Sequence, residues 1–164
     1  MTMHRPDLPA IDRAKIHAEV LVPILQHLQD EVGRERALEI LRAAVGEMTR
    51  KNMSEFVDAV GNDKAVAVVW RGVSDKATWE RVHPLVVEDR EVTDTLAEFD
   101  VVDCGYAKYF NEIGQPELGF LMVCSADFDM IDSVPEIELT RSQTRMQGAQ
   151  HCDFRYRLRR SSET

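Results

Sequence analysis

The sequence predicts an α+β fold, in which an N-terminal helical hairpin packs with a mainly antiparallel sheet of about four strands and an inserted helical segment. Apolar residues recur at helical spacing in the first half, whereas four later segments alternate apolar and polar residues. At 164 residues the chain has the length of one domain that can bury a core without disulfides. We therefore expect a single domain over residues 1–164, helical over about 11–83 and sheet-containing over about 84–160.

Two long helices open the chain. Apolar residues recur at helical spacing over residues 11–32. Pro23 should bend or split this helix, because proline removes an amide and clashes with the preceding turn. A second helical pattern covers residues 34–60 and stops at Gly61, so the two helices should form a hairpin. Residues 63–83 add a helical stretch of uncertain limits.

The second half combines strands with the inserted helical segment. Strand alternation occurs over residues 84–94, 96–104, 136–147 and 151–159. Helical patterns cover residues 106–114 and 116–133, between the second and third of these strands. Gly148 should form the turn that joins the last two strands.

The charge composition argues against several classes of partner. The chain has 29 Asp and Glu against 20 Lys and Arg, a net charge of -9. Because phosphate binding needs excess positive charge, we expect a small-molecule partner and neither nucleic acid nor a membrane. No segment approaches the ~20 apolar residues that cross a bilayer, and the first twelve residues lack the apolar core of a secretory signal. Three widely spaced cysteines suit a reducing compartment, so the sequence predicts a cytoplasmic protein.

The last predicted strand contains a candidate reactive thiol in "GAQHCDFRYRLRR", residues 148–160. Side chains alternate across a strand, so Cys152 should face one way while His151 and Asp153 face the other. A direct pair of Cys152 and His151 would need a bulge or a strand end to turn one side chain around. Cys152 is therefore either a nucleophile or a small buried core residue.

The other two cysteines widen the choice of chemistry. Cys124 and Asp127 lie three residues apart in a predicted helix and can share one face, where a buried carboxylate would need a partner. Cys104, Cys124 and Cys152, or two of them with His151, could meet around zinc. The short ligand spacings typical of zinc sites are missing, so a requirement for a divalent metal stays open.

Polar residues beside the last strand could bind a substrate. Arg141, Arg145 and Arg155 could hold a carboxylate by bidentate hydrogen bonds, or they could balance the acidic surface. Thr144 lies on the other face of the predicted strand 136–147. The lone histidines His17, His27 and His83 are assigned no role.

The C-terminal third resembles a known family of hydrolases. In "CGYAKYFNEIGQPELGFLMVCSADFDMIDSVPEIELTRSQTRMQGAQHCDFRYR", residues 104–157, a cysteine precedes "YAKYF", an "ELGFL" helix carries a cysteine and an aspartate, and a "GAxHCDFRY" motif follows. This order is similar to that of the L-2-amino-thiazoline-4-carboxylic acid hydrolase family. The resemblance implies a hydrolase of C–N or C–S bonds that opens a small cyclic amidine to give an N-carbamoyl amino acid.

For such a reaction the residues supply two alternative mechanisms. Cys152 is the candidate nucleophile, with His151 or Asp127 as its base and Asp153 as the residue that orients the base. Alternatively, Asp127 activates water directly and the thiols line the pocket. The candidate substrate-binding residues are Cys104, Cys124, Thr144 and Arg155.

A binding module is the alternative to an enzyme. A non-catalytic sensory module of similar fold could bury all three thiols around a small ligand or metal, whereas an enzyme needs a base near its nucleophile or water. The long apolar faces of the helical half favour a homo-oligomer.

Overall fold

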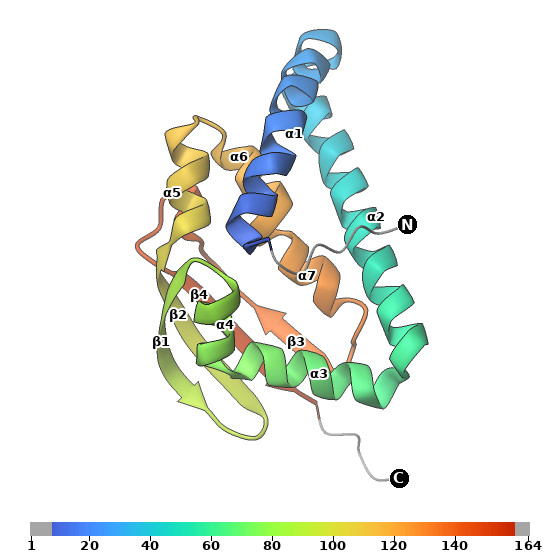
Figure 1. Ribbon diagram of the computed structural model, residues 1–164, viewed down its shortest axis with the longest axis vertical. Coiled ribbons are helices and arrows are strands. Elements are labelled where there is room, and N and C mark those ends of the chain that lie inside the picture. Colours follow the sequence, from blue (N-terminus) through green and yellow to red (C-terminus); the bar gives the residue numbers. More distant parts are fainter. Residues whose placement is uncertain (1–7, 160–164) are drawn as a thin grey trace.

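Helices form the first half of the chain that the computed structural model describes, which is residues 8–159. These helices are α1 (Ala10–Val32), α2 (Arg34–Val60), α3 (Asn62–Ser74) and α4 (Lys76–Val82). In Figure 1, α1 and α2 run side by side along the long axis of the molecule and connect at Gly33, whose φ of 83° favours glycine. The predicted hairpin is confirmed, and the second helix has the predicted limits.

Of the two effects predicted for Pro23, a bend or a split of the first helix, the split does not occur. α1 continues through this proline as one helix. Proline costs a helix one backbone hydrogen bond. Because Pro23 lies on the exposed side of α1, water can satisfy the carbonyl group that loses its partner.

The helical stretch predicted over residues 63–83 divides into α3 and α4. The division falls at Asp75, whose carboxylate accepts a hydrogen bond from the Ala77 N–H at 3.1 Å and from the Thr78 hydroxyl at 2.6 Å. A carboxylate that caps an N-terminus in this way starts a new helix.

In the described chain, four strands form one antiparallel sheet. They are β1 (Leu85–Val92), β2 (Leu96–Cys104), β3 (Ile137–Thr140) and β4 (Cys152–Leu158), in the spatial order β1-β2-β4-β3. The pairing of β2 with β4 sets Val101 opposite Cys152. Helices, an inserted segment and this antiparallel sheet together confirm the predicted α+β class.

The inserted segment contains an irregular turn. Its elements are α5 (Gly105–Glu112), α6 (Pro116–Gly119), the π-helical turn η1 (Phe120–Cys124) and α7 (Ala126–Ile131). The Ser125 N–H donates to the carbonyl of Phe120 at 2.8 Å, five residues back. Such π-turns are frequent at functional sites, because the extra residue changes the direction of the side chains that follow.

The strand predicted over residues 136–147 is too long. β3 ends at Thr140, and a loop then leads to the short 3₁₀ helix η2 (Arg145–Gln147). The cause lies on β4, where Asp153 accepts hydrogen bonds from the backbone N–H groups of Ser142 and Gln143 at 3.0 and 2.8 Å. These two amides therefore bond a side chain in place of a neighbouring strand.

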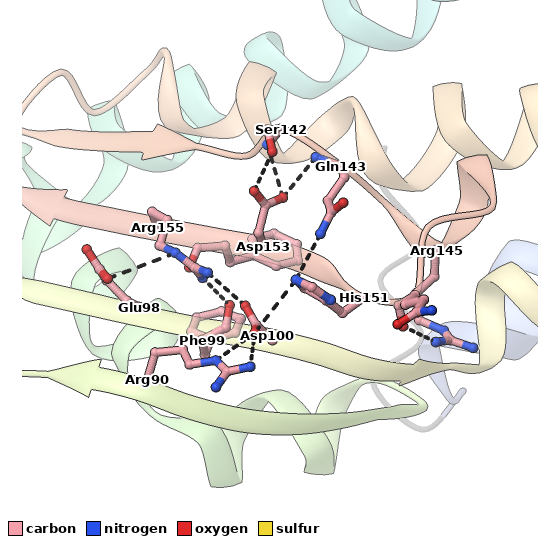
Figure 2. A network of polar contacts seen from close by, with 12 residues as sticks. Arg90, Glu98, Phe99, Asp100, Ser142, Gln143, Arg145, His151, Asp153 and Arg155 are labelled. Carbon is pink, nitrogen blue, oxygen red and sulfur yellow. Dashed lines mark hydrogen bonds and ion pairs between the residues drawn. The ribbon is translucent and has the colours of Figure 1, made fainter.

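The two faces of the sheet differ in chemistry. Phe99, Phe154 and Tyr156 are buried on one face, with rings stacked at centroid distances of 5.2 to 6.1 Å. Asp100 and Arg155 point to the other face (Figure 2). Within residues 8–159, no helix is both long enough and apolar enough to span a bilayer.

Candidate active site

A cavity of about 60 Å³ lies between the buried face of the sheet and the inserted segment. Its apolar lining includes Trp79, Val101, Val123 and Phe154. The polar groups that line it are His83, Cys104, Tyr106, Cys124, Asp127, Arg141 and Cys152. A mainly apolar cavity with a few convergent polar groups has the character of a small-molecule site.

The three cysteines reach this cavity from three elements. Cys104 ends β2 and caps α5, its sulfur 3.4 Å from the Ala107 N–H. Cys152 begins β4, and Cys124 ends the π-turn. All three are free thiols and buried.

Burial keeps these thiols protonated. It raises the pKa of Cys152 to about 11, although the Arg145 N–H, 3.2 Å from the sulfur, acts in the opposite direction. Burial likewise raises the pKa of Cys104 and, more strongly, of Cys124. At neutral pH each is a thiol and not a thiolate.

Asp127 and Arg141 form a partly buried ion pair at the cavity. Arg141 Nη1 donates to Asp127 Oδ2 at 2.6 Å, and Nη2 donates to the carbonyl of Cys124, also at 2.6 Å. The guanidinium lies 5.1 Å from the ring centre of Phe128 and 4.8 Å from that of Phe154. Its side chain is 2% exposed, so Arg141 is held fixed.

The Asp127 carboxyl has an unusual proton affinity. Burial raises its pKa to about 6, against the opposing effect of the Arg141 guanidinium. Its side chain remains 24% exposed. A carboxylate with a pKa near the working pH is suited to accept and return a proton.

A histidine and a tyrosine face each other at the same cavity. His83 Nδ1 lies 2.9 Å from the Tyr106 hydroxyl. Burial, and then the Arg13 charge, lowers the pKa of His83. Burial, and then the Cys104 charge, raises the pKa of Tyr106 to about 12. The pair is therefore neutral at pH 7.

Sequence reasoning assigned no role to this pair. The register of β1 and β2 could have indicated this pair. Leu85 pairs with Cys104, which brings His83 and Tyr106 to the same end of the sheet. The sequence indicates Arg141 only as one of three arginines that could bind a carboxylate, because its ion pair with Asp127 depends on the loop after β3.

His151 and Asp153 lie beside Gln143 and Ser142 on the polar face of the sheet (Figure 2), whereas Cys152 lines the cavity. His151 Nε2 is 2.8 Å from Gln143 Nε2 and 3.8 Å from a carboxylate oxygen of Asp100. Asp153 binds the loop after β3, as described above. This placement gives neither residue contact with the cavity, so it supports no proton transfer between His151 and Cys152.

Two predicted substrate-binding residues also lie away from the cavity. Arg155 Nη2 donates to Asp100 Oδ1 at 2.9 Å on the polar face (Figure 2). Thr144 is buried and caps η2, where its oxygen accepts the Gln147 N–H at 3.2 Å. In the structure each of these side chains therefore binds another part of the chain. In the described residues, no three His, Cys, Asp or Glu side chains are grouped so that they could hold a metal ion.

A protein-family model matches most of the chain. Residues 13–156 match the model of the family described as L-2-amino-thiazoline-4-carboxylic acid hydrolase. No curated protein matches the chain. The match covers most of the helical hairpin and every residue that lines the cavity.

Proposed function

Because the chain belongs to the L-2-amino-thiazoline-4-carboxylic acid hydrolase family, we propose that it hydrolyses a small cyclic amidine that carries a carboxylate. The substrate class is that of 2-amino-thiazoline-4-carboxylate, and the product is an N-carbamoyl amino acid with a free thiol. The observation that carries this proposal is the Asp127 carboxylate, fixed by Arg141 beside three protonated thiols.

Asp127 suits the amidine group of such a ring. The neutral amidine of such a ring carries an amino group, and a carboxylate oxygen can accept a hydrogen bond from its N–H. Within residues 8–159, the only hydrogen bond to the Asp127 carboxylate comes from Arg141 and uses Oδ2. Lone pairs on Oδ1 therefore remain for the ring.

The reaction follows from one base that acts twice. Water adds to the ring carbon between nitrogen and sulfur while Asp127 takes one of its protons and passes it to the ring nitrogen. Asp127 then takes the proton of the new hydroxyl as the carbonyl forms and the C–S bond breaks. The electron pair of that bond leaves with sulfur, which must receive a proton to become the thiol.

Attack by water is favoured over attack by Cys152. With a pKa of about 11, formation of the Cys152 thiolate at pH 7 costs about 5 kcal/mol, at about 1.4 kcal/mol per pH unit. Asp127 requires no such cost, because it is mostly charged at pH 7. The three thiols are then walls of the pocket.

Binding of the ring must rearrange the cavity. Its volume of about 60 Å³ is far below the ~300 Å³ at which the usual range of ligand pockets begins. Side chains of the lining must therefore move when a five-membered ring with two substituents enters. Exclusion of water by the bound ring would strengthen its contacts with Asp127.

The test is ring opening of 2-amino-thiazoline-4-carboxylate, followed through the free thiol of the product. We expect Asp127→Asn to lower kcat on the order of 10²-fold or more, because the base is lost. Cys152→Ser should stay within about tenfold of wild type. Asp132→Asn is the matched control, because this aspartate is exposed near the end of the same segment. Unchanged turnover by Asp127→Asn, or no turnover by wild type on a panel of cyclic amidines and ureas, would contradict the proposal.

A second candidate function is a non-catalytic small-ligand module. The burial of all three thiols favours it, since a binding module needs no reactive thiol. Calorimetric binding of the thiazoline by wild type, with no ring opening over days, would support this alternative.

A further inference from the structure

The pair of His83 and Tyr106 has no part in the mechanism above, although both residues line the cavity. The hydrogen bond between Nδ1 and the phenol oxygen, 2.9 Å long, holds them together. Tyr106 is buried and His83 is partly exposed. The pair thus extends from the interior of the cavity towards the surface.

His83 also borders a second space. A surface hollow of about 160 Å³ is lined by Gly72, Val73, Thr78, Trp79, Val82 and His83. Trp79 and His83 are common to this hollow and to the cavity. The imidazole therefore lies between solvent and Tyr106.

The leaving sulfur needs a proton that Asp127 does not supply. Burial makes a thiolate strongly basic in this cavity, since it raises the pKa of Cys152 to about 11. Burial also raises the pKa of the Tyr106 phenol, to about 12, which is close to that of such a thiol. Proton transfer between groups of similar pKa is efficient.

We propose that Tyr106 donates the proton to the leaving ring atom and that His83 replaces it from solvent. This inference rests on the proposed function. As the C–S bond breaks and its electron pair moves to sulfur, the phenol proton passes to sulfur. The Nδ1 proton of His83 then moves to the phenol oxygen, while Nε2 takes a proton from water in the hollow.

The proton balance closes over one turnover. His83 exchanges its Nδ1–H form for its Nε2–H form and returns to the first through solvent. Asp127 releases to solvent the proton that it took from the hydroxyl, so one proton enters and one leaves. Arg13 acts on His83, and Cys104, Arg13 and Asp127 act on Tyr106; burial, and then the Arg13 charge, lowers the pKa of His83 and keeps the imidazole neutral, as this exchange requires.

Two variants test this proton relay, from His83 through Tyr106 to the leaving sulfur, in the same ring-opening assay. Tyr106→Phe keeps the ring but removes the proton, and we expect kcat to fall on the order of 10²-fold while KM changes little. His83→Ala should also lower kcat, and added imidazole should restore it by occupying the space that the side chain leaves. 1-Methylimidazole should not restore it, because only one of its nitrogens can carry a proton. The control is His27→Ala, an exposed position on α1, which should keep the wild-type rate with or without imidazole.

Each result separates the relay from the proposed function. If wild type opens the ring and both variants keep its kcat, the relay is wrong and the proposed function stands. If His83→Ala is slow but folded by circular dichroism and imidazole fails to restore it, the relay is also wrong. If His83→Ala does not fold, His83→Gln replaces it, because glutamine keeps the volume of the side chain. The kcat of His83→Gln should also fall. A wild-type kcat in this variant would overturn the relay. No ring opening by wild type overturns both proposals.

Discussion

At the scale of single residues, the pH dependence of turnover should report Asp127. A base must be deprotonated to act, and the pKa of this carboxyl is raised to about 6 by burial against the effect of Arg141. We expect kcat/KM to fall tenfold per pH unit below about pH 6 and to be level just above it. The measurement is a pH profile of ring opening from pH 4 to 8.

A substitution of Arg141 tests whether Asp127 controls the acidic limb of this pH profile. Arg141→Lys keeps a positive charge but loses the planar fork that binds Asp127 and the Cys124 carbonyl together. With a weaker partner, the pKa of Asp127 should rise and the acidic limb of the profile should move to higher pH. A limb that stays in place would show that a group other than Asp127 controls it.

At the scale of secondary-structure elements, a substitution on the polar face of the sheet should change stability and leave activity unchanged. Asp100 on β2 is 1% exposed and accepts hydrogen bonds from Arg90 at 2.6 Å and Arg155 at 2.9 Å. Burial alone would raise its pKa, but these two arginines reverse the shift and lower it. We expect Asp100→Asn to cost on the order of 2 kcal/mol of the free energy of unfolding at pH 7. Its kcat should be unchanged, because the residue lies away from the cavity.

The sign of this effect with pH is fixed by the lowered pKa. A carboxylate whose folded pKa is depressed contributes stability above its unfolded pKa of 3.8, and this stability is lost as the pH falls through the folded value. The difference between wild type and Asp100→Asn should therefore shrink towards low pH in urea titrations. Asp89→Asn, at an exposed site on β1, should show no such difference at any pH.

The same elements indicate what sequence patterns can and cannot predict. The limits of α2 follow from a long helical pattern between two glycines, both of which have positive φ. Alternation also predicts that Cys152 and His151 face opposite ways, and in the structure Cys152 lines the cavity whereas His151 does not. The end of β3 could not be predicted, because its cause is the Asp153 side chain from another strand.

At the scale of the whole molecule, the cavity results from tertiary contacts that no local pattern contains. Its three thiols come from two strands and the π-turn, and the antiparallel pairing of β2 with β4 brings two of them together. The three cysteines could be identified from the sequence as candidate site residues. Their shared burial, which raises all three pKa values, appears only when the inserted segment packs on the sheet.

This packing also predicts how the native protein reacts with alkylating agents. Iodoacetamide reacts with the thiolate, and burial raises the pKa of Cys152 to about 11. Labelling of Cys152, followed by mass spectrometry of its peptide, should therefore be slow at pH 7 and rise about tenfold per pH unit towards pH 10. Denatured protein, with an ordinary thiol pKa of ~8.5, is the reference and should level off above that pH. Fast native labelling that is already level at pH 7 would mean that Cys152 is a thiolate, and the ring carbon would then be attacked by sulfur and not by the water that Asp127 activates.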